Sequence, residues 1–111
     1  MARYVLVVRT NCADESRDDD FNDWYDNTHL PDVLEIPGFV AAARYVSPLA
    51  GPLAWESGKF LATYEIETED IDKTLALMGE HMDKKRKQGR FSELLIIVGA
   101  SLYKQISSMT K

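Results

Sequence analysis

Residues 16–38, SRDDDFNDWYDNTHLPDVLEIPG, are the segment that most constrains what this chain can fold into. At about 100° per residue, a helix through this segment gathers four side chains on one face: Phe21, Trp24, Tyr25 and Thr28. Ser16 and Asp19 resemble the capping box that begins a helix, and His29 lies on the rim of the aromatic face. Because Pro31 disfavours helical angles at the residue before it, we expect the helix to end just as it delivers His29. The segment therefore predicts a titratable group held at a rigid helix end beside aromatic rings.

Composition limits the partners that this chain can have. The 111 residues are enough for one domain, which we take to span residues 1–111, and the 45% hydrophobic content is ordinary for a globular protein. A net charge of −5 argues against a nucleic-acid or anionic-membrane partner, and no apolar run approaches the ~20 residues of a membrane helix. Cys12 is the single cysteine, so no internal disulfide can form. We therefore expect a cytoplasmic protein with no nucleic-acid and no membrane partner.

Apolar alternation and turn residues divide the remainder into strands and a second helix. The predicted strands are residues 3–9, 39–46, 59–67 and 100–106. Thr68 can cap a helix that buries an apolar stripe and ends at Gly89. Residues 90–99 contain another strand-like run, LLIIV, which we take as a loop or short helix. The apolar connection at residues 47–58 is expected to be either a lid over a pocket or a contact with another subunit.

The order strand, helix, strand, strand, helix, strand predicts the ferredoxin-like βαββαβ sandwich, an α+β fold. Its four-stranded antiparallel sheet would carry both helices on one face. The predicted strands are apolar on both sides, so the other face also needs cover, and a second copy of the chain would supply it. We therefore expect a homodimer. Small side chains at Ala41, Ala43 and Ala62 either leave room for a cavity under the first helix or allow close packing against a partner sheet.

The helix and turn in FNDWYDNTHLPDVLEIPGF resemble a signature of the dimeric α/β-barrel superfamily, in its EthD-like and polyketide-cyclase-like forms. The shared features are an aromatic-rich helix, a histidine soon followed by proline, and a Pro-Gly turn into the second strand. The resemblance implies a homodimer whose sheets face each other as a barrel, with a pocket in each subunit between sheet and helices. Members of the superfamily include cyclases, isomerases, dehydratases, haem-degrading enzymes and oxygenases without metal or flavin, so the fold alone does not set the function.

Acid–base catalysis by His29 is the chemistry that the residues permit. Two histidines and one cysteine, without His-x-x-x-His or Cys-x-x-Cys spacing, predict no metal site, and no glycine-rich loop predicts a nucleotide cofactor. A neutral imidazole can take or give a proton without a cofactor. Tyr64, expected at the sheet edge near the helix end, is a candidate to donate a hydrogen bond to an oxyanion. The candidates for substrate contact are Trp24, Tyr25, Phe39, Tyr4, Phe21 and His81.

Structural roles remain open for several of these residues. A histidine at a helix end can simply cap backbone carbonyls, and Tyr64 and Trp24 can be ordinary core residues. The antiparallel helices are expected to place His29 near the start of the second helix, with His81 about 18 Å further along it as an exposed residue. This separation is a second reason to expect no shared metal.

The leading hypothesis is a cofactor-independent lyase, isomerase or cyclase with His29 as general acid or base and Tyr64 as its partner. Its substrate would be a small, largely apolar, oxygenated molecule of an aromatic or polyketide-like kind. Two alternatives remain open: a cofactor-free monooxygenase of the same superfamily, and a non-catalytic protein that binds a small molecule.

Overall fold

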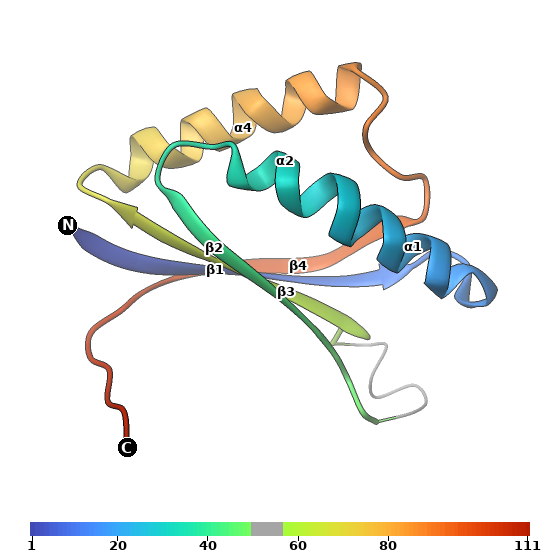
Figure 1. Ribbon diagram of the computed structural model, residues 1–111, viewed down its shortest axis with the longest axis horizontal. Helices are drawn as coiled ribbons and strands as arrows, with labels where there is room; N and C mark the ends of the chain where they lie inside the picture. Colours follow the sequence, from blue (N-terminus) through green and yellow to red (C-terminus); the bar gives the residue numbers. More distant parts are fainter. Residues whose placement is uncertain (50–56) are drawn as a thin grey trace.

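The sheet has four antiparallel strands in the order β2-β3-β1-β4 (Figure 1). The computed structural model describes residues 1–49 and 57–111, so most of the 47–58 connection lies outside the described residues. The strands are β1 (Ala2–Cys12), β2 (Phe39–Val46), β3 (Phe60–Thr68) and β4 (Leu95–Lys104). With the helices on one face, this arrangement confirms the predicted ferredoxin-like α+β fold. Three of the four strands lie within a few residues of their predicted positions.

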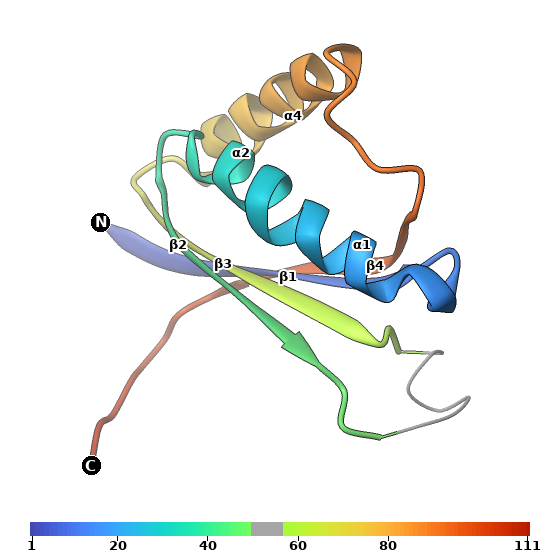
Figure 2. The ribbon, with the colours of Figure 1, turned by 45° about the vertical axis from the view of Figure 1, so that its right-hand side comes forward.

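Two helical segments pack side by side on the same face of the sheet (Figures 1 and 2). The first combines a 3-10 turn (Glu15–Arg17), α1 (Asp18–Trp24), a π-helical turn (Tyr25–His29) and α2 (Leu30–Leu34). The second is α4 (Ile71–Lys87), whose N-cap Asp70 accepts a hydrogen bond from the backbone N–H of Lys73. Asp14, not Ser16, caps the first segment, because its carboxylate accepts from the backbone N–H of Ser16.

The first helix does not end before Pro31, as the sequence predicted, but continues to Leu34. Pro31 has no N–H to donate one turn back, and its ring would collide with that turn in a regular α-helix. The turn at Tyr25–His29 widens to the π form, in which the N–H of Leu30 bonds to the carbonyl of Tyr25, five residues earlier. This wider turn accommodates the proline, so His29 lies within the helix and not at its end.

Ala41 and Ala43 do not lie under the first helix, as a cavity beside them there would require, because the register of β2 shifts between Phe39 and Ala41. Phe39 pairs with Ile66, and after the shift Ala42 pairs with Tyr64 and Arg44 with Ala62. Residues directly opposite each other share a face of the sheet, so Ala42 and Arg44 lie under the helices. The residues that face the other way are Ala41, Ala43 and Tyr45. A single extra residue at the start of the strand therefore moves every later side chain of β2 to the opposite face of the sheet.

The prediction that residues 90–99 form a loop or short helix is wrong for the second half of that segment, residues 95–99. The run LLIIV and the following residues form one ten-residue strand, β4, that pairs with β1 from Tyr4 to Cys12. A register shift between Arg9 and Thr10 lets the strand continue past Gly99. Only the first residue of that run, Leu94, lies outside the strand and in the core, at 5% exposure.

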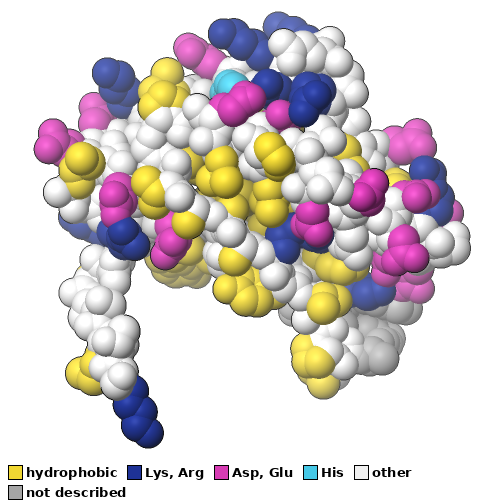
Figure 3. All heavy atoms as spheres, viewed as in Figure 1, with side chains coloured by type: hydrophobic (Ala, Val, Ile, Leu, Met, Phe, Trp, Pro, Cys, Tyr) yellow, Lys and Arg dark blue, Asp and Glu magenta, His cyan; other side chains and the backbone are white. Residues whose placement is uncertain are grey.

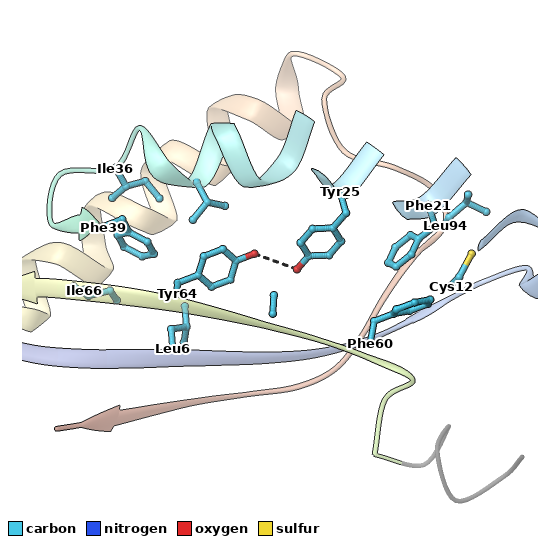
Figure 4. Packing of buried hydrophobic residues seen from close by; sticks show 12 residues of the cluster. Leu6, Cys12, Phe21, Tyr25, Ile36, Phe39, Phe60, Tyr64, Ile66 and Leu94 are labelled. Atoms are coloured by element: carbon cyan, nitrogen blue, oxygen red, sulfur yellow. Dashed lines mark hydrogen bonds between the residues drawn. The ribbon is translucent and has the colours of Figure 1, made fainter. Parts of the chain in front are cut away.

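The hydrophobic core lies between the helices and the sheet (Figure 4). Its buried members are Leu6, Cys12, Phe21, Tyr25, Val33, Ile36, Phe39, Phe60, Ala62, Tyr64, Ile66 and Leu94. In the space-filling view, hydrophobic side chains gather between the helices and the sheet, with charged side chains around them (Figure 3). The opposite face carries no helix and exposes large apolar side chains such as Tyr45 and Tyr103. No helix in the described part of the chain is long and apolar enough to cross a membrane.

Candidate functional site

A pocket of about 210 Å³ opens between the sheet and the two helical segments. Apolar side chains from all layers form most of its wall, among them Leu6, Val8, Val33, Met78, Met82, Phe91, Leu95 and Ile97. Three uncharged polar side chains reach it from two elements: Tyr25 and His29 from the π-helical turn, and Tyr64 from β3. Arg86, near the end of α4, is the one charged residue in the described part of this wall. Apolar walls with a few convergent polar groups are typical of small-molecule sites.

His29 is buried to 9% exposure and is held by aromatic rings. Its ring stacks on Trp24 at 4.9 Å with an interplanar angle of 23°, and meets Tyr25 edge-on at 4.9 Å and Phe91 at 5.4 Å. Residues five apart do not overlie each other on an α-helix, so the π-helical turn explains why Trp24 and His29 stack. None of the hydrogen bonds found among residues 1–49 and 57–111 involves a ring nitrogen of His29.

The surroundings keep His29 neutral. Burial is the main reason that the pKa of His29 falls to about 4, and the cation of Arg44 lowers it further, while Asp32 acts in the opposite direction. An uncharged imidazole with unbonded nitrogens can accept a proton, and its conjugate acid gives that proton back readily. The arrangement is therefore suited to transient proton transfer and not to holding an anion.

Tyr25 and Tyr64 form a buried pair of hydroxyl groups, 3.1 Å apart (Figure 4). Tyr25 is 1% exposed and Tyr64 is 2% exposed. Burial raises the pKa of both phenols, and for Tyr64 the neighbouring Tyr25 raises the pKa further. Both hydroxyls therefore stay protonated, and one of them donates to the other. The acceptor of that bond keeps its own proton, which can serve a ligand oxygen.

The segment after α4 closes one side of the pocket through two contacts made by Arg90. Its guanidinium bonds both carboxylate oxygens of the buried Asp32, at 2.7 and 2.9 Å. Its backbone carbonyl accepts a bond from the indole N–H of Trp24 at 2.8 Å. Burial acts most strongly and would raise the pKa of Asp32, but the hydrogen bonds and charge of Arg90, together with the charge of Lys85, hold that pKa below its usual value. These contacts fix Phe91 against the imidazole of His29.

The structure brings three of the predicted site residues to the pocket: His29, Tyr64 and Tyr25. Trp24 lies behind His29 and supports it. Phe21, fully buried beside Phe60, is not among the pocket-lining residues.

Three further candidates also lie away from this wall. Phe39 packs 6.1 Å from the ring of Tyr64, and Tyr4 packs against the edge of the core. His81 bonds the carbonyl of Asp32 through Nε2 at 2.9 Å. Substrate contact by Phe21, Phe39, Tyr4 and His81 stays a prediction, as do the roles of His29, Tyr64, Tyr25 and Trp24.

The expected position of His29 along the second helix is wrong. Its ring contacts Phe91, which follows α4, and it shares the pocket with Met82 and Arg86 near the end of that helix. The reason is that the first helix continues beyond His29 as α2. Therefore α2, and not His29, lies beside the middle of α4, where His81 bonds the carbonyl of Asp32.

Sequence reasoning overlooked Arg44 and Asp32, the two charged groups that act on the pKa of His29. Arg44 stands alone among apolar residues inside β2, which is a signal for a buried charge with a dedicated partner. Asp32 gave no comparable signal, because its partner Arg90 lies 58 positions away in the sequence. Among the described residues, no cluster of three or more His, Cys, Asp or Glu side chains could hold a metal ion.

No protein-family model matches the sequence, and a search of curated proteins found no match. Solved structures do match along almost the whole chain. A dimeric ferredoxin-like protein from an uncultured marine organism has a TM-score of 0.65 and 12% identity over 98% of this chain and 100% of that chain. SnoaB, a cofactor-independent oxygenase from Streptomyces nogalater, has a TM-score of 0.62 and 13% identity over 100% of both chains. An ethyl tert-butyl ether D (EthD) family protein from Bacillus halodurans C-125 has a TM-score of 0.57 and 14% identity over 96% of this chain and 100% of that chain.

The chain therefore has the same ferredoxin-like fold as these three structures. The resemblance stated from residues 21–39 is thereby confirmed, at the level of the fold. At these identities the likeness carries no activity from one protein to another. The pocket of this chain lies where the resemblance implied, between the sheet and the helices.

Proposed function

We propose that this chain is a cofactor-independent oxygenase that acts on a small, largely apolar aromatic molecule carrying a ketone or phenol oxygen. The observation that carries the proposal is a neutral His29 with unbonded ring nitrogens, in the wall of an apolar pocket that also contains two buried phenols. The pocket volume of about 210 Å³ suits a ligand of one to three fused rings.

The reaction would begin with proton transfer. A ring nitrogen of His29 accepts the proton from a carbon next to the substrate carbonyl, and the electron pair of that C–H bond forms an enolate. A hydroxyl of the tyrosine pair donates a hydrogen bond to the enolate oxygen, which lowers the energy of the developing charge. Apolar walls exclude water, which strengthens these electrostatic contacts.

Dioxygen would then be the oxidant. The enolate carbon forms a C–O bond to dioxygen, and the resulting peroxide takes back the proton held by His29. Loss of water from that hydroperoxide, with breakage of its O–O bond and removal of the second hydrogen of the original CH₂, converts the carbon to a carbonyl. One oxygen atom enters the product, the other leaves as water, and the substrate carbon is oxidised by four electrons.

Similarity to SnoaB, described as a cofactor-independent oxygenase, supports this proposal over the lyase, isomerase or cyclase that led the hypotheses from sequence. The two proposals share the proton transfer by His29 and the oxyanion contact from Tyr64. They differ only in what the enolate does next, because a lyase, isomerase or cyclase resolves it without dioxygen.

Oxygen uptake is the test of the proposal. The purified protein is supplied with hydroxylated tetralones, which carry a CH₂ next to the carbonyl, with a metal chelator present and no flavin. Dissolved oxygen and products are followed together. The proposal predicts one dioxygen consumed and one oxygen atom incorporated for each substrate molecule. Conversion without oxygen uptake would favour a lyase, isomerase or cyclase, and tight binding with unchanged ligand would favour a binding protein.

We also propose that two copies associate through the sheet face that carries no helix. Its support is the exposed apolar side chains on that face, including Ile96, Val98 and Tyr103, together with the structural likeness to a protein described as dimeric. Light scattering at micromolar concentration should give twice the mass of one chain, and a stable monomer would contradict this. A reducing, cytoplasmic location remains part of the proposal, supported by the unpaired thiol of the buried Cys12.

A further inference from the structure

Arg44 is a nearly buried cation under the first helix, with its side chain 12% exposed. It lies in the interior of β2, opposite Ala62 of β3. Its Nη1 donates to the carboxylate of Asp26 at 3.0 Å, and its Nη2 donates to the amide oxygen of Asn22 at 2.9 Å. The guanidinium carbon lies 4.3 Å from the ring centroid of Tyr25. This contact places a positive charge directly against a phenol of the pocket.

The hydrogen bonds from Arg44 to α1 and the π-helical turn use the two terminal nitrogens of the guanidinium but not its Nε. Its Nε is buried and has no hydrogen-bond partner in the part of the chain that the structure describes. Aromatic rings lie around it instead: Tyr25, with Phe60 at 5.4 Å and Phe21 at 5.8 Å. A cation is attracted to the negative face of an aromatic ring, and the attraction is stronger where water is excluded. The charge is therefore compensated in part by Tyr25.

A cation at the ring face makes a phenol a better hydrogen-bond donor, because it stabilises negative charge on the ring and its oxygen. Of the two hydroxyls in the pair, that of Tyr25 belongs to the ring in closest contact with Arg44. Burial raises the pKa of both phenols, and the charge of Arg44 acts to lower both. Because the guanidinium carbon lies 4.3 Å from the ring centroid of Tyr25, that ring carries most of this effect, and the hydroxyl of Tyr25 is the better donor of the two.

We propose that Arg44 is a positioning residue that sets the direction of the hydrogen bond in the pair, so that Tyr25 donates to Tyr64 and Tyr64 donates to the ligand. The pocket then selects ligands that present an acceptor oxygen, such as a cyclic ketone or its enolate, to the hydroxyl of Tyr64. The inference rests on the proposed function only in taking this pocket as the ligand site. Without Arg44 the direction of the pair would no longer be fixed.

The first test compares two ligands that differ only in the acceptor oxygen, α-tetralone and the hydrocarbon tetralin. Tyr64→Phe should weaken α-tetralone binding about tenfold, because it removes the donor, and Tyr25→Phe should weaken it only about twofold to threefold. Neither change should alter the affinity for tetralin beyond a small packing effect. The opposite ranking of the two variants, with Tyr25→Phe the more damaging, would overturn the proposal.

The second test concerns Arg44 itself and uses the conservative variant as a control. Arg44→Met should weaken α-tetralone binding about threefold, and Arg44→Lys, which keeps the charge, should restore most of it. In a Tyr25→Phe background, Arg44→Met should have no further effect on α-tetralone affinity, because the residue through which it acts is gone. Equal losses in both backgrounds would mean that Arg44 only holds β2 against α1. Thermal unfolding of each variant identifies losses that come from a damaged fold.

The third test needs no ligand. The carbon-Cζ chemical shift of Tyr25, assigned by its absence in Tyr25→Phe, reports how strongly its hydroxyl donates at neutral pH. The charged and titratable groups around Tyr25 are Arg44 from β2, Tyr64 from β3, and His29 and Asp26 from its own helix. Because each of them could affect the signal, all variants are compared at the same pH. Arg44→Met should move the signal upfield, away from the tyrosinate position, and Arg44→Lys should leave it near the original value. An unmoved signal in Arg44→Met would overturn the proposal even if no ketone binds.

Discussion

The two faces of the sheet are built by the same four strands, yet they carry different kinds of side chain. The face under the helices holds the buried core, Tyr64 and Arg44, with the His29 pocket above it. The other face has small residues at its centre, such as Ala43 and Thr63, between the exposed rings of Tyr45 and Tyr103. It forms a hollow of about 570 Å³, more than twice the volume of the pocket under the helices.

This comparison shows that the larger of two hollows need not be the one whose side chains can catalyse a reaction. The larger hollow contains Arg3 and Glu65, which pair with each other at 3.7 Å, and has no neutral base in its described wall. The smaller pocket has a buried imidazole beside two phenols. The open face, which exposes large apolar side chains and carries no helix, suits a flat partner, whereas the covered pocket suits a small ligand. We therefore assign reaction chemistry to the covered face and association to the open one.

Removing the imidazole of His29 should have the largest effect on turnover. We expect His29→Gln to lower the turnover of any substrate found by at least about a hundredfold, because glutamine cannot accept the proton. His81→Gln is the matched control, since His81 bonds the carbonyl of Asp32 outside the pocket, and its turnover should change little. Steady-state kinetics of both variants measure this difference in turnover. An active His29→Gln enzyme would remove the chemical distinction between the two faces.

The pH dependence of stability should reveal the burial of His29. Its pKa is lowered from 6.5 to about 4, so between these values the unfolded chain binds more protons than the folded chain. The stabilising contribution is fully present above the unfolded pKa and is lost as the pH falls toward the folded pKa. Urea titrations should show about 2 kcal/mol less stability from this group at about pH 5 than at about pH 7. His29→Gln should be less sensitive by that amount, whereas an equal pH dependence in both proteins would mean that the imidazole titrates normally.

Placing a larger side chain on each face in turn should have a smaller effect, on ligand affinity for one face and on self-association for the other. Ala100 lines the pocket, so Ala100→Leu should reduce α-tetralone affinity about tenfold, or about 1.4 kcal/mol. Ala41 faces the open side, so Ala41→Leu should leave that affinity unchanged and weaken self-association instead. Calorimetry with the ketone and light scattering of both variants give the two readouts. Loss of ketone binding in Ala41→Leu with Ala100→Leu unaffected would place the ligand on the open face.

Much of the fold could be predicted because local patterns and global arrangement agree. The alternation in residues 39–46 and 59–67 and the apolar stripe of the second helix each demand one buried face, and the order of elements then leaves few topologies. The long apolar stretch before Ala100 was misassigned, because periodicity alone cannot distinguish one strand that pairs along most of β1 from two shorter runs.

The candidate site was predictable only in part, for reasons of geometry. His29 and Tyr64 carry recognisable chemistry, so the sequence suggested them, and both reach the pocket. The π-helical turn that accommodates Pro31 and stacks Trp24 on His29 follows from tertiary packing and not from any local propensity. One shifted residue in β2 decided that Arg44, and not Ala43, lies beside Tyr25, and such a shift leaves no clear trace in the pattern of hydrophobic residues.

A crystal structure of the protein with α-tetralone tests the central claim, that ligand chemistry belongs to the face under the helices, most directly. The account predicts the ketone in the pocket between sheet and helices, its ring against Met82 and Phe91, and its oxygen within hydrogen-bond distance of the Tyr64 hydroxyl, with a His29 nitrogen facing the carbon next to the carbonyl. A ketone seated in the open-face hollow near Ala43 and Tyr103, with the His29 pocket empty, would contradict it.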